Sequence, residues 1–520
     1  MGDPIMILST IFGLCLLLLL IRLLHTFWWT PVYIQYRLGS QGIKGPSYKF
    51  IHGNTKEMLE KMRNAAVSKP LGLLDDIFPR VLPHVYTWLS KYGKNYLSWK
   101  GAQPELMITE PELIKEVLIN RDRAYLKPSP PFDSMKLMGN GLVTSNGERW
   151  VQHRNLINNA FQGESLKKMI PEMVVSVEVM LQSWKNHLEN EIEVFEEFRL
   201  LSADIISRTA FGSNYLEGKN IFDMKVKYSN ITRMNIFKSR FPSISKIWKT
   251  SDEIEADKLL SIIHKSVMDI IKKREEKVKL GEIDNYDTDF LGLLLQAYHD
   301  VDENRRILIE DLIDECKTFY IVGQEPINSL LSWTVLLLAI HTDWQEKARE
   351  EVIELFGRQN PLPDDLSKLN IVTMIINEAL RLYPPAVGFP RKCDSEVRLG
   401  KFILPANIHL FISNLVAHHD PRIWGDDAHL FNPERFSGGV AKATSNNVAA
   451  YFPFGFGPRT CVGFKSATMG AKIVLIMILQ RYRFTLSPAY VHSPVVHFIL
   501  YPQHGIQVIL HSLKSEEFPS

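Results

Sequence analysis

The chain has 520 residues, a formal net charge of +2, 45% hydrophobic residues and 23% charged residues. These proportions are typical of a globular protein with a large core, and the near-neutral charge excludes an electrostatic nucleic-acid binder. No Ser/Gly/Pro-rich linker divides the chain after its first fifty residues. We therefore expect one large, mainly α unit with a minor β region.

The cysteines are few and widely spaced: Cys15, Cys316, Cys393 and Cys461. No pair is close enough in the sequence for a zinc knuckle, and the first cysteine lies in an apolar tail. This spacing argues against disulfide scaffolding and against structural zinc. We expect most of the chain to face a reducing compartment.

The N-terminal segment is predicted to be a retained membrane anchor. Ile5–Ile21 carries no charge, and the aromatic residues Phe27–Trp29 follow it as an interfacial belt. A cleaved signal peptide is the alternative, but a basic n-region and a small-residue cleavage site are missing. We assign 1–29 to the anchor and 30–50 to a Pro/Gly hinge. Basic residues that place the rest of the chain in the cytoplasm follow the span: Arg22, Arg37, Lys44 and Lys49.

A Pro-rich loop, Lys127–Phe132, precedes a helix that carries Trp150 and Arg154 four residues apart on one face. The loop is either a flexible pocket wall or a plain connection. An indole N–H and a guanidinium both donate to carboxylates, so the helix face is a candidate site for cofactor carboxylates. The alternative for this pair is a cation–π contact at the surface.

The longest helical pattern runs over Asp311–His341 and becomes almost entirely apolar, as expected of a buried central helix. Gly323 removes bulk where a ligand could approach. Pro326 lacks a backbone donor and frees a carbonyl one turn earlier, which predicts a local bulge. Glu325, an acid beside this break, is a candidate proton carrier, and a structural hydrogen-bonding role is the alternative.

A further helix ends at prolines after Glu378 and Arg381, which share a face at i,i+3. Alone, such a pair is an ordinary surface ion pair. Its apolar neighbours favour burial instead, where Arg435 of a later segment could supply a second cation. Short β patterns are predicted at Val397–Leu399, Phe402–Leu404, Ile408–Ile412, Val495–Tyr501 and Ile506–Leu510.

The loop Phe454–Gly463 places one cysteine, Cys461, between glycines and directly before an apolar helical pattern, with Arg459 two residues earlier. The glycine spacing fits neither a phosphate loop nor a dinucleotide fingerprint. The alternative is that Cys461 is an inert thiol packed in the protein interior. The pattern suits a thiolate that binds haem iron, with helix-start amides near the sulfur and Arg459 near a propionate.

Taken together, the cysteine loop, the Glu378/Arg381 helix, the Trp150/Arg154 pair and the N-terminal span resemble the plant microsomal cytochromes P450, in particular the 72 clan. The resemblance implies a mainly α haem-thiolate fold with an N-terminal transmembrane helix and one catalytic domain over 51–520. It implies Cys461 as the metal ligand, and the following residues as cofactor-binding positions for haem b: Trp150, Arg154, Arg391, Phe454, Arg459, Cys461 and Gly463.

The resemblance also implies partners and a location. A membrane-bound NADPH-cytochrome reductase would supply electrons, the substrate would be a lipophilic small molecule, and the enzyme would be a single-pass protein of the endoplasmic reticulum membrane with its catalytic domain in the cytoplasm. By the same analogy, pocket walls would come from Phe132, Met135, Phe237, Phe319, Tyr320, Val387–Phe389 and Phe498–Leu500.

Two residues depart from the family pattern. Pro326 stands where the family usually has an oxygen-activating threonine, and Gly470 stands where relatives commonly have an acid. Gly323 and Glu325 remain as the candidate catalytic residues. The first hypothesis is a monooxygenase that hydroxylates a hydrophobic molecule such as a terpenoid, steroid or hormone-like metabolite. The alternatives are a haem-thiolate isomerase, dehydratase or lyase, or a catalytically impaired haem protein.

Overall fold

The computed structural model describes residues 4–120, 123–130, 132–235, 249–283, 286, 289–303 and 305–513. Helices dominate these residues, and most of the strands are short, which confirms the predicted mainly α class with a minor β region. Phe237, one of the pocket residues implied by the resemblance, lies outside the described residues.

The first eleven helices cover the anchor and the N-terminal half. Their bounds are α1 Pro4–Leu24, α2 Thr30–Gly39, α3 Thr55–Val67, α4 Phe78–Val81, α5 Pro83–Tyr92, α6 Pro111–Ile119, α7 Phe132–Met138, α8 Gly147–Asn158, α9 Gly163–Trp184, α10 Val194–Phe211 and α11 Tyr215–Asn235. The remaining helices are α13 Ser251–Lys279, α14 Phe290–Tyr298, α15 Ile309–Val322, α16 Gln324–Ile340, α17 Thr342–Phe356, α18 Ile371–Leu382, α19 Asn414–His418, α20 Pro421–Trp424, α21 Gly439–Ala443 and α22 Phe464–Leu479.

The strands form one larger sheet and three small ones in the described part of the chain. The larger sheet has the order β1-β2-β8-β5-β3, with β2 and β8 parallel and the other neighbours antiparallel. A second sheet has the order β4-β12-β9, and β6-β7 and β10-β11 are hairpin pairs. The bounds are β1 Leu97–Lys100, β2 Gln103–Ile108, β3 Tyr125–Leu126, β4 Glu191–Glu193, β5 Phe389–Cys393, β6 Val397–Leu399, β7 Phe402–Leu404, β8 His409–Ile412, β9 Tyr482–Leu486, β10 Pro494–Val496, β11 Leu500–Pro502 and β12 Gln507–Ser512.

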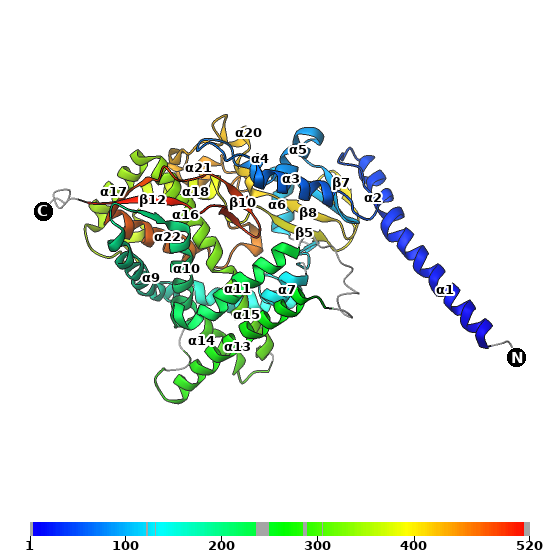
Figure 1. Cartoon of the computed structure of the whole chain (residues 1–520), viewed down its shortest axis with the longest axis horizontal. Helices are drawn as coiled ribbons and strands as arrows, with labels where there is room; N and C mark the ends of the chain where they lie inside the picture. Colours follow the sequence, from blue (N-terminus) through cyan, green and yellow to red (C-terminus); the bar gives the residue numbers. More distant parts are fainter. Residues whose placement is uncertain are drawn as a thin grey trace.

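The N-terminal helix extends away from the body (Figure 1). A continuous helical stretch from Met6 to Gly39 has a mean hydropathy of 2.6 over its most apolar window, which is not buried, so its length and composition suit a membrane span. The helix continues through α2, which forms the first half of the segment predicted as a hinge, and only Ser40 onward leaves it. Pro31 follows a π-helical turn, His25–Trp29, in which the N–H of Thr30 donates to the carbonyl of His25, and this local change of hydrogen bonding accommodates the missing proline donor.

The central helical pattern forms two consecutive pieces, α15 and α16, that meet at Gly323. Pro326 lies in the first turn of α16, and without an N–H it leaves the carbonyl of Val322 without its helical donor. The predicted interruption is therefore present. Gly323 keeps right-handed helical dihedral angles, so the axis loses one hydrogen bond without a change of hand.

Gly470, the second departure from the family pattern, is buried in α22. A side chain at this position would point at the sulfur of Met173 on α9, which lies 3.6 Å from the position a Cβ atom would take. An acidic group there would enter an apolar helix–helix contact and lose its hydration. The glycine thus agrees with the local packing of α9 against α22.

Candidate functional site

Local backbone hydrogen bonds hold the conformation of the cysteine loop. The N–H of Cys461 donates to the carbonyl of Phe454 (2.9 Å), and the N–H of Gly455 donates to Phe452 (3.0 Å). Gly455 and Gly457 both have positive φ, +76° and +75°, which L side chains rarely adopt. A side chain at Gly457 would also collide with the carbonyl of Leu118 in α6. The loop consequently needs glycine at both positions.

The side chain of Cys461 is exposed by accessible area, yet enough protein surrounds it to raise the pKa of its thiol by desolvation. A backbone hydrogen bond from Gly463 and the positive charge of Arg154 both lower this pKa again. Sulfur that is accessible on one side and surrounded by protein on the other suits a ligand to a bound group. The hydrogen bond from Gly463 and the charge of Arg154 both stabilise the thiolate form of the side chain.

Helix α8 holds the cysteine loop through two arginines. The Nη1 atom of Arg154 donates to the carbonyl of Thr460 (2.7 Å). Nη2 of Arg459 in the loop donates to Oδ1 of Asn146, the residue before α8 (2.8 Å), and its guanidinium carbon lies 4.4 Å from the centre of the Trp150 ring in α8. The cation–π partner of Trp150 is therefore Arg459 of the loop.

A group of cations gathers around this loop: Lys127, Arg154, Arg391 and Arg459. Burial and the charge of Arg391 lower the pKa of Lys127 to about 7, with Arg459 adding to the effect. Burial lowers the pKa of Arg391 to about 10. Burial, followed by Arg391 and Arg154, lowers the pKa of Arg459 to about 10.

Among the described residues, these four cations form no ion pair with a carboxylate. Each is hydrogen-bonded only to neutral oxygens, such as the Val143 carbonyl for Lys127 and the Pro390 carbonyl for Arg391. Partly buried like charges repel each other and are stable together only with anions nearby. The cluster therefore fits a dianionic group beside the cysteine, as the two propionates of haem would provide.

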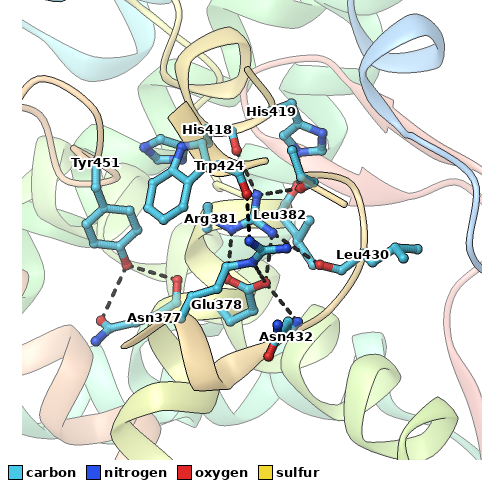
Figure 2. A network of polar contacts seen from close by, with 12 residues as sticks. Asn377, Glu378, Arg381, Leu382, His418, His419, Trp424, Leu430, Asn432 and Tyr451 are labelled. Atoms are coloured by element: carbon cyan, nitrogen blue, oxygen red, sulfur yellow. Dashed lines mark hydrogen bonds and ion pairs between the residues drawn. The ribbon is translucent and has the colours of Figure 1, made fainter. Parts of the chain in front are cut away.

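The predicted Glu378/Arg381 pair is fully buried, with both side chains 0% exposed. Arg381 donates to both carboxylate oxygens of Glu378 at 2.7 Å, and Figure 2 shows the surrounding network. The N–H of Asn432 also donates to Glu378 (2.9 Å), and Nε of Arg435 lies 3.5 Å from the same oxygen. The structure thus brings together Glu378, Arg381 and Arg435, the three charged residues that the sequence analysis expected in one buried group.

His418 connects this network to the cysteine loop, a role that the sequence reasoning missed. Its carbonyl accepts from Arg381 (2.7 Å), and its Nε2 accepts from the N–H of Phe452 (3.1 Å), two residues before the loop begins. Burial and the charge of Arg381 hold the pKa of His418 well below its usual range, so the imidazole stays a neutral acceptor.

Glu325 does not stand alone at the break in the central helix. Lys225 of α11 donates to its Oε1 (2.7 Å) and also to Oε1 of the neighbouring Gln324 (2.9 Å). Lys225 is buried, and desolvation lowers its pKa against the opposing pull of Glu325. The structural alternative for Glu325, a hydrogen-bonding role, is therefore present, and its predicted catalytic role remains a prediction.

Gly323 faces the protein interior. The space that a side chain would need is taken by the carbonyl of Phe319 and by the Cδ1 atom of Ile206 on α10. In this structure the glycine allows close packing between α10 and the central helix. Its predicted role in approach to a ligand stays a prediction.

The pocket residues implied by the resemblance separate into two groups. Val387, Gly388 and Phe498 line a cavity of about 340 Å³. Tyr320 stacks on Phe211 with ring centres 3.9 Å apart and is fully buried. This second environment is a packed aromatic core, so Tyr320 contributes to helix packing.

The cysteine loop, its cations and the surrounding helices are features of the haem-thiolate class of proteins. A family model described as Cytochrome P450 matches residues 80–510. The chain belongs to the cytochrome P450 family, whose members are haem-containing monooxygenases that receive electrons from a redox partner.

Relatives in plants cover the chain almost end to end. Cytochrome P450 CYP749A22 of Panax ginseng is 52% identical over 515 residues, which is 98% of each chain. Cytochrome P450 72A68 of Medicago truncatula is 38% identical over 507 residues, and 11-oxo-beta-amyrin 30-oxidase of Glycyrrhiza uralensis is 41% identical over 508 residues, both covering 95% of each chain. These similarities confirm the resemblance to plant cytochromes P450 of the 72 clan.

Proposed function

We propose that the protein inserts one oxygen atom into a lipophilic terpenoid, with haem b bound at Cys461. The observation that carries the proposal is the cation cluster without carboxylates, Lys127, Arg154, Arg391 and Arg459, beside the cysteine loop. Trp150, Phe454 and Gly463 complete the cofactor-binding set. The terpenoid class is supported by the relative named as an 11-oxo-beta-amyrin 30-oxidase.

Bound haem would supply oxygen activation at a thiolate-ligated iron. The residues of the chain then have separate tasks. Arg154, Arg391, Arg459 and Lys127 would bind the propionates, and the Gly463 N–H would stabilise negative charge on the sulfur of Cys461. Buried apolar surfaces would exclude water from the substrate.

The electrons are proposed to come from NADPH through a membrane-bound reductase. The protein is proposed to be a single-pass protein of the endoplasmic reticulum membrane, with 1–29 as the anchor and 51–520 as one catalytic domain in the cytoplasm. The candidate span supports the membrane location, and its basic C-terminal flank supports the orientation.

The test uses microsomes that contain the full chain and a reductase, supplied with a panel of triterpenoids, NADPH and isotopically labelled oxygen. The expected result is a product that carries one labelled oxygen and requires NADPH. A product formed without NADPH would instead support an isomerase, dehydratase or lyase, which Pro326 favours because it removes the usual threonine hydroxyl. Without any product across the panel, the terpenoid proposal fails.

Proton delivery is proposed to pass through Glu325, and Lys225 is the buried donor that holds it. Lys225→Met removes the ammonium group while keeping an unbranched chain of similar length. We expect the fraction of NADPH electrons recovered in product to fall at least about tenfold, since a positioned proton donor is lost. The measurement compares product formed with NADPH consumed.

The matched control is Lys227→Met, because Lys227 is exposed on the same helix, α11. Both variants should bind haem like the wild type, judged by their absorption spectra. Equal recovery of electrons in the two variants would show that the Lys225–Glu325 pair is only structural.

A further inference from the structure

The cavity that contains Val387 and Phe498 has a second end, formed by helix α5 and the β1-β2 hairpin. Successive side chains of a strand point to opposite faces of the sheet, and this alternation decides which of them face the cavity. Leu97 and Trp99 of β1 point into the core that holds α2, whereas Ser98 and Lys100 point into the cavity. The facing strand β2 repeats this pattern, so the hairpin separates the α2 core from the cavity.

Most of the cavity wall is apolar, with Met58, Val85, Met107 and Phe411 among the residues that line it. Four polar side chains line the end formed by α5, β1 and β2, namely His84, Ser98, Lys100 and Glu105, and His497 is a further polar residue beside Phe498. Its volume of about 340 Å³ is at the lower limit of small-molecule sites, so it can hold one end of a larger ligand. An apolar body with one polar end would match this wall.

The polar end contains an imidazole without a complete set of partners. His84 is only 9% exposed, and its Nδ1 finds no hydrogen-bond partner among the described residues. Burial, together with Lys100 and Lys61, lowers the pKa of His84 to about 3, so the ring is neutral near pH 7. A buried polar nitrogen costs free energy unless a ligand hydrogen-bonds to it.

Charged and polar groups surround His84, and the positive charge of Lys61 acts on it in addition to that of Lys100. Lys100 and Glu105 form an ion pair of 2.6 Å, and Ser98 contributes a hydroxyl beside it. A ligand carboxylate would lie beside the like charge of Glu105 and compete with it for the ammonium group of Lys100, which disfavours an acidic ligand. A ligand hydroxyl can accept from or donate to Nδ1 of neutral His84, and a hydroxyl or carbonyl oxygen can accept from the Lys100 ammonium group, without adding charge.

Another part of the cavity wall comes from the segment that precedes β5. Val387 and Gly388 of this segment line the cavity, and the ring of the next residue, Phe389, packs against the cysteine loop at Gly455, 3.3 Å from the position a Cβ atom would take there. One short segment therefore contacts both the cavity and the loop. A ligand fixed at the polar end would extend along this segment.

We propose that His84, Ser98 and Lys100 form a subsite for a hydroxyl or carbonyl group at one end of a rigid lipophilic substrate. The inference rests on the proposed function for the ligand class. It adds the chemical group that is recognised and the residues that recognise it. The subsite positions the substrate and takes no part in proton or electron transfer.

The test measures partition of a radiolabelled ligand between nanodiscs that contain the haem-loaded full chain and empty nanodiscs. The probes are 11-oxo-beta-amyrin, which has a hydroxyl on its first ring, and the analogue that lacks only this hydroxyl. We expect the wild type to prefer the hydroxylated probe by about fivefold or more, as two hydrogen bonds would provide. His84→Phe and Ser98→Ala should reduce this preference to less than about twofold.

Ser90→Ala is the matched control, because Ser90 is exposed on the same helix as His84. It should keep the full preference, and all variants should bind the deoxy probe equally. His84→Phe replaces a buried polar ring by an apolar one, so its thermal midpoint should not fall. A wild type that binds the two probes equally or binds neither, or variants that keep the wild-type preference, would overturn the inference.

The experiments test the proposed reaction and the proposed subsite independently of each other. Labelled product without any preference for the hydroxyl would remove the subsite and leave the monooxygenase proposal standing. A preference that depends on His84, without labelled product, would establish the subsite and remove the proposed reaction.

Discussion

Arg381→Met is expected to lower the free energy of unfolding by about 3–5 kcal/mol, because it leaves the carboxylate of Glu378 buried without its main partner. Both side chains are 0% exposed, and Arg381 also donates to the carbonyls of His418, Ala428 and Leu430. Domains of this kind have only about 5–15 kcal/mol of stability in total. We therefore expect little folded, haem-binding protein.

Chemical unfolding and the yield of haem-loaded protein would both report this change. Arg422→Met is the matched control: Arg422 also pairs with a carboxylate, that of Asp420, but its side chain is 56% exposed. An exposed pair contributes less than about 1 kcal/mol, so this variant should resemble the wild type. Equal stability of the two variants would show that burial of the Glu378/Arg381 pair does not determine the stability of this fold.

Cys461→Ala is expected to remove the thiolate signature of the reduced, carbon monoxide-bound protein completely, together with oxygen insertion. The substitution removes only the sulfur atom, which is the proposed ligand to the iron. The loop is held by backbone bonds, such as the Cys461 N–H to Phe454, and by Arg154 and Arg459 from the side, so its conformation should persist. Far-ultraviolet circular dichroism should remain that of the wild type.

Cys316→Ala provides the comparison for this experiment. Burial raises the pKa of the Cys316 thiol far above its usual range, and the residue packs in α15 within the main core. This thiol should be inert, and the variant should retain the thiolate spectrum. If Cys461→Ala kept the same spectrum as Cys316→Ala, then Cys461 would not be the metal ligand.

The residues that could be predicted from the sequence are those whose spacing has a local meaning. Glu378 and Arg381 share one helix face, and Cys461 stands in a glycine loop before a helix, so each pattern is readable within ten residues. The interruption of the central helix was equally local, because Pro326 itself removes the donor. The β patterns at Val397–Leu399, Phe402–Leu404, Ile408–Ile412 and Ile506–Leu510 correspond to β6, β7, β8 and β12, whereas Val495–Tyr501 forms the β10-β11 hairpin.

Lys127, Lys225 and His418 could not be found in this way. Each is a single polar residue whose role depends on a partner far away in the sequence: Lys127 lies beside Arg391 and Arg459, and Lys225 lies beside Glu325. A lone lysine on a helix or in a Pro-rich loop is normally solvated, so its sequence context gives no signal. Burial, which only the fold shows, distinguishes them.

Helix α2 has a consequence for how the enzyme meets the lipid. Ile34 and Leu38 belong to the same core as Leu97 and Trp99 of β1, and the helix joins the candidate span without an intervening loop. Span and catalytic body thus share one rigid element, and the angle between them is set by side-chain packing. With the span in a bilayer, as proposed, the packing of α2 would restrict rotation of the body and keep it close to the lipid surface, so a water-insoluble ligand would have a short path from bilayer to protein.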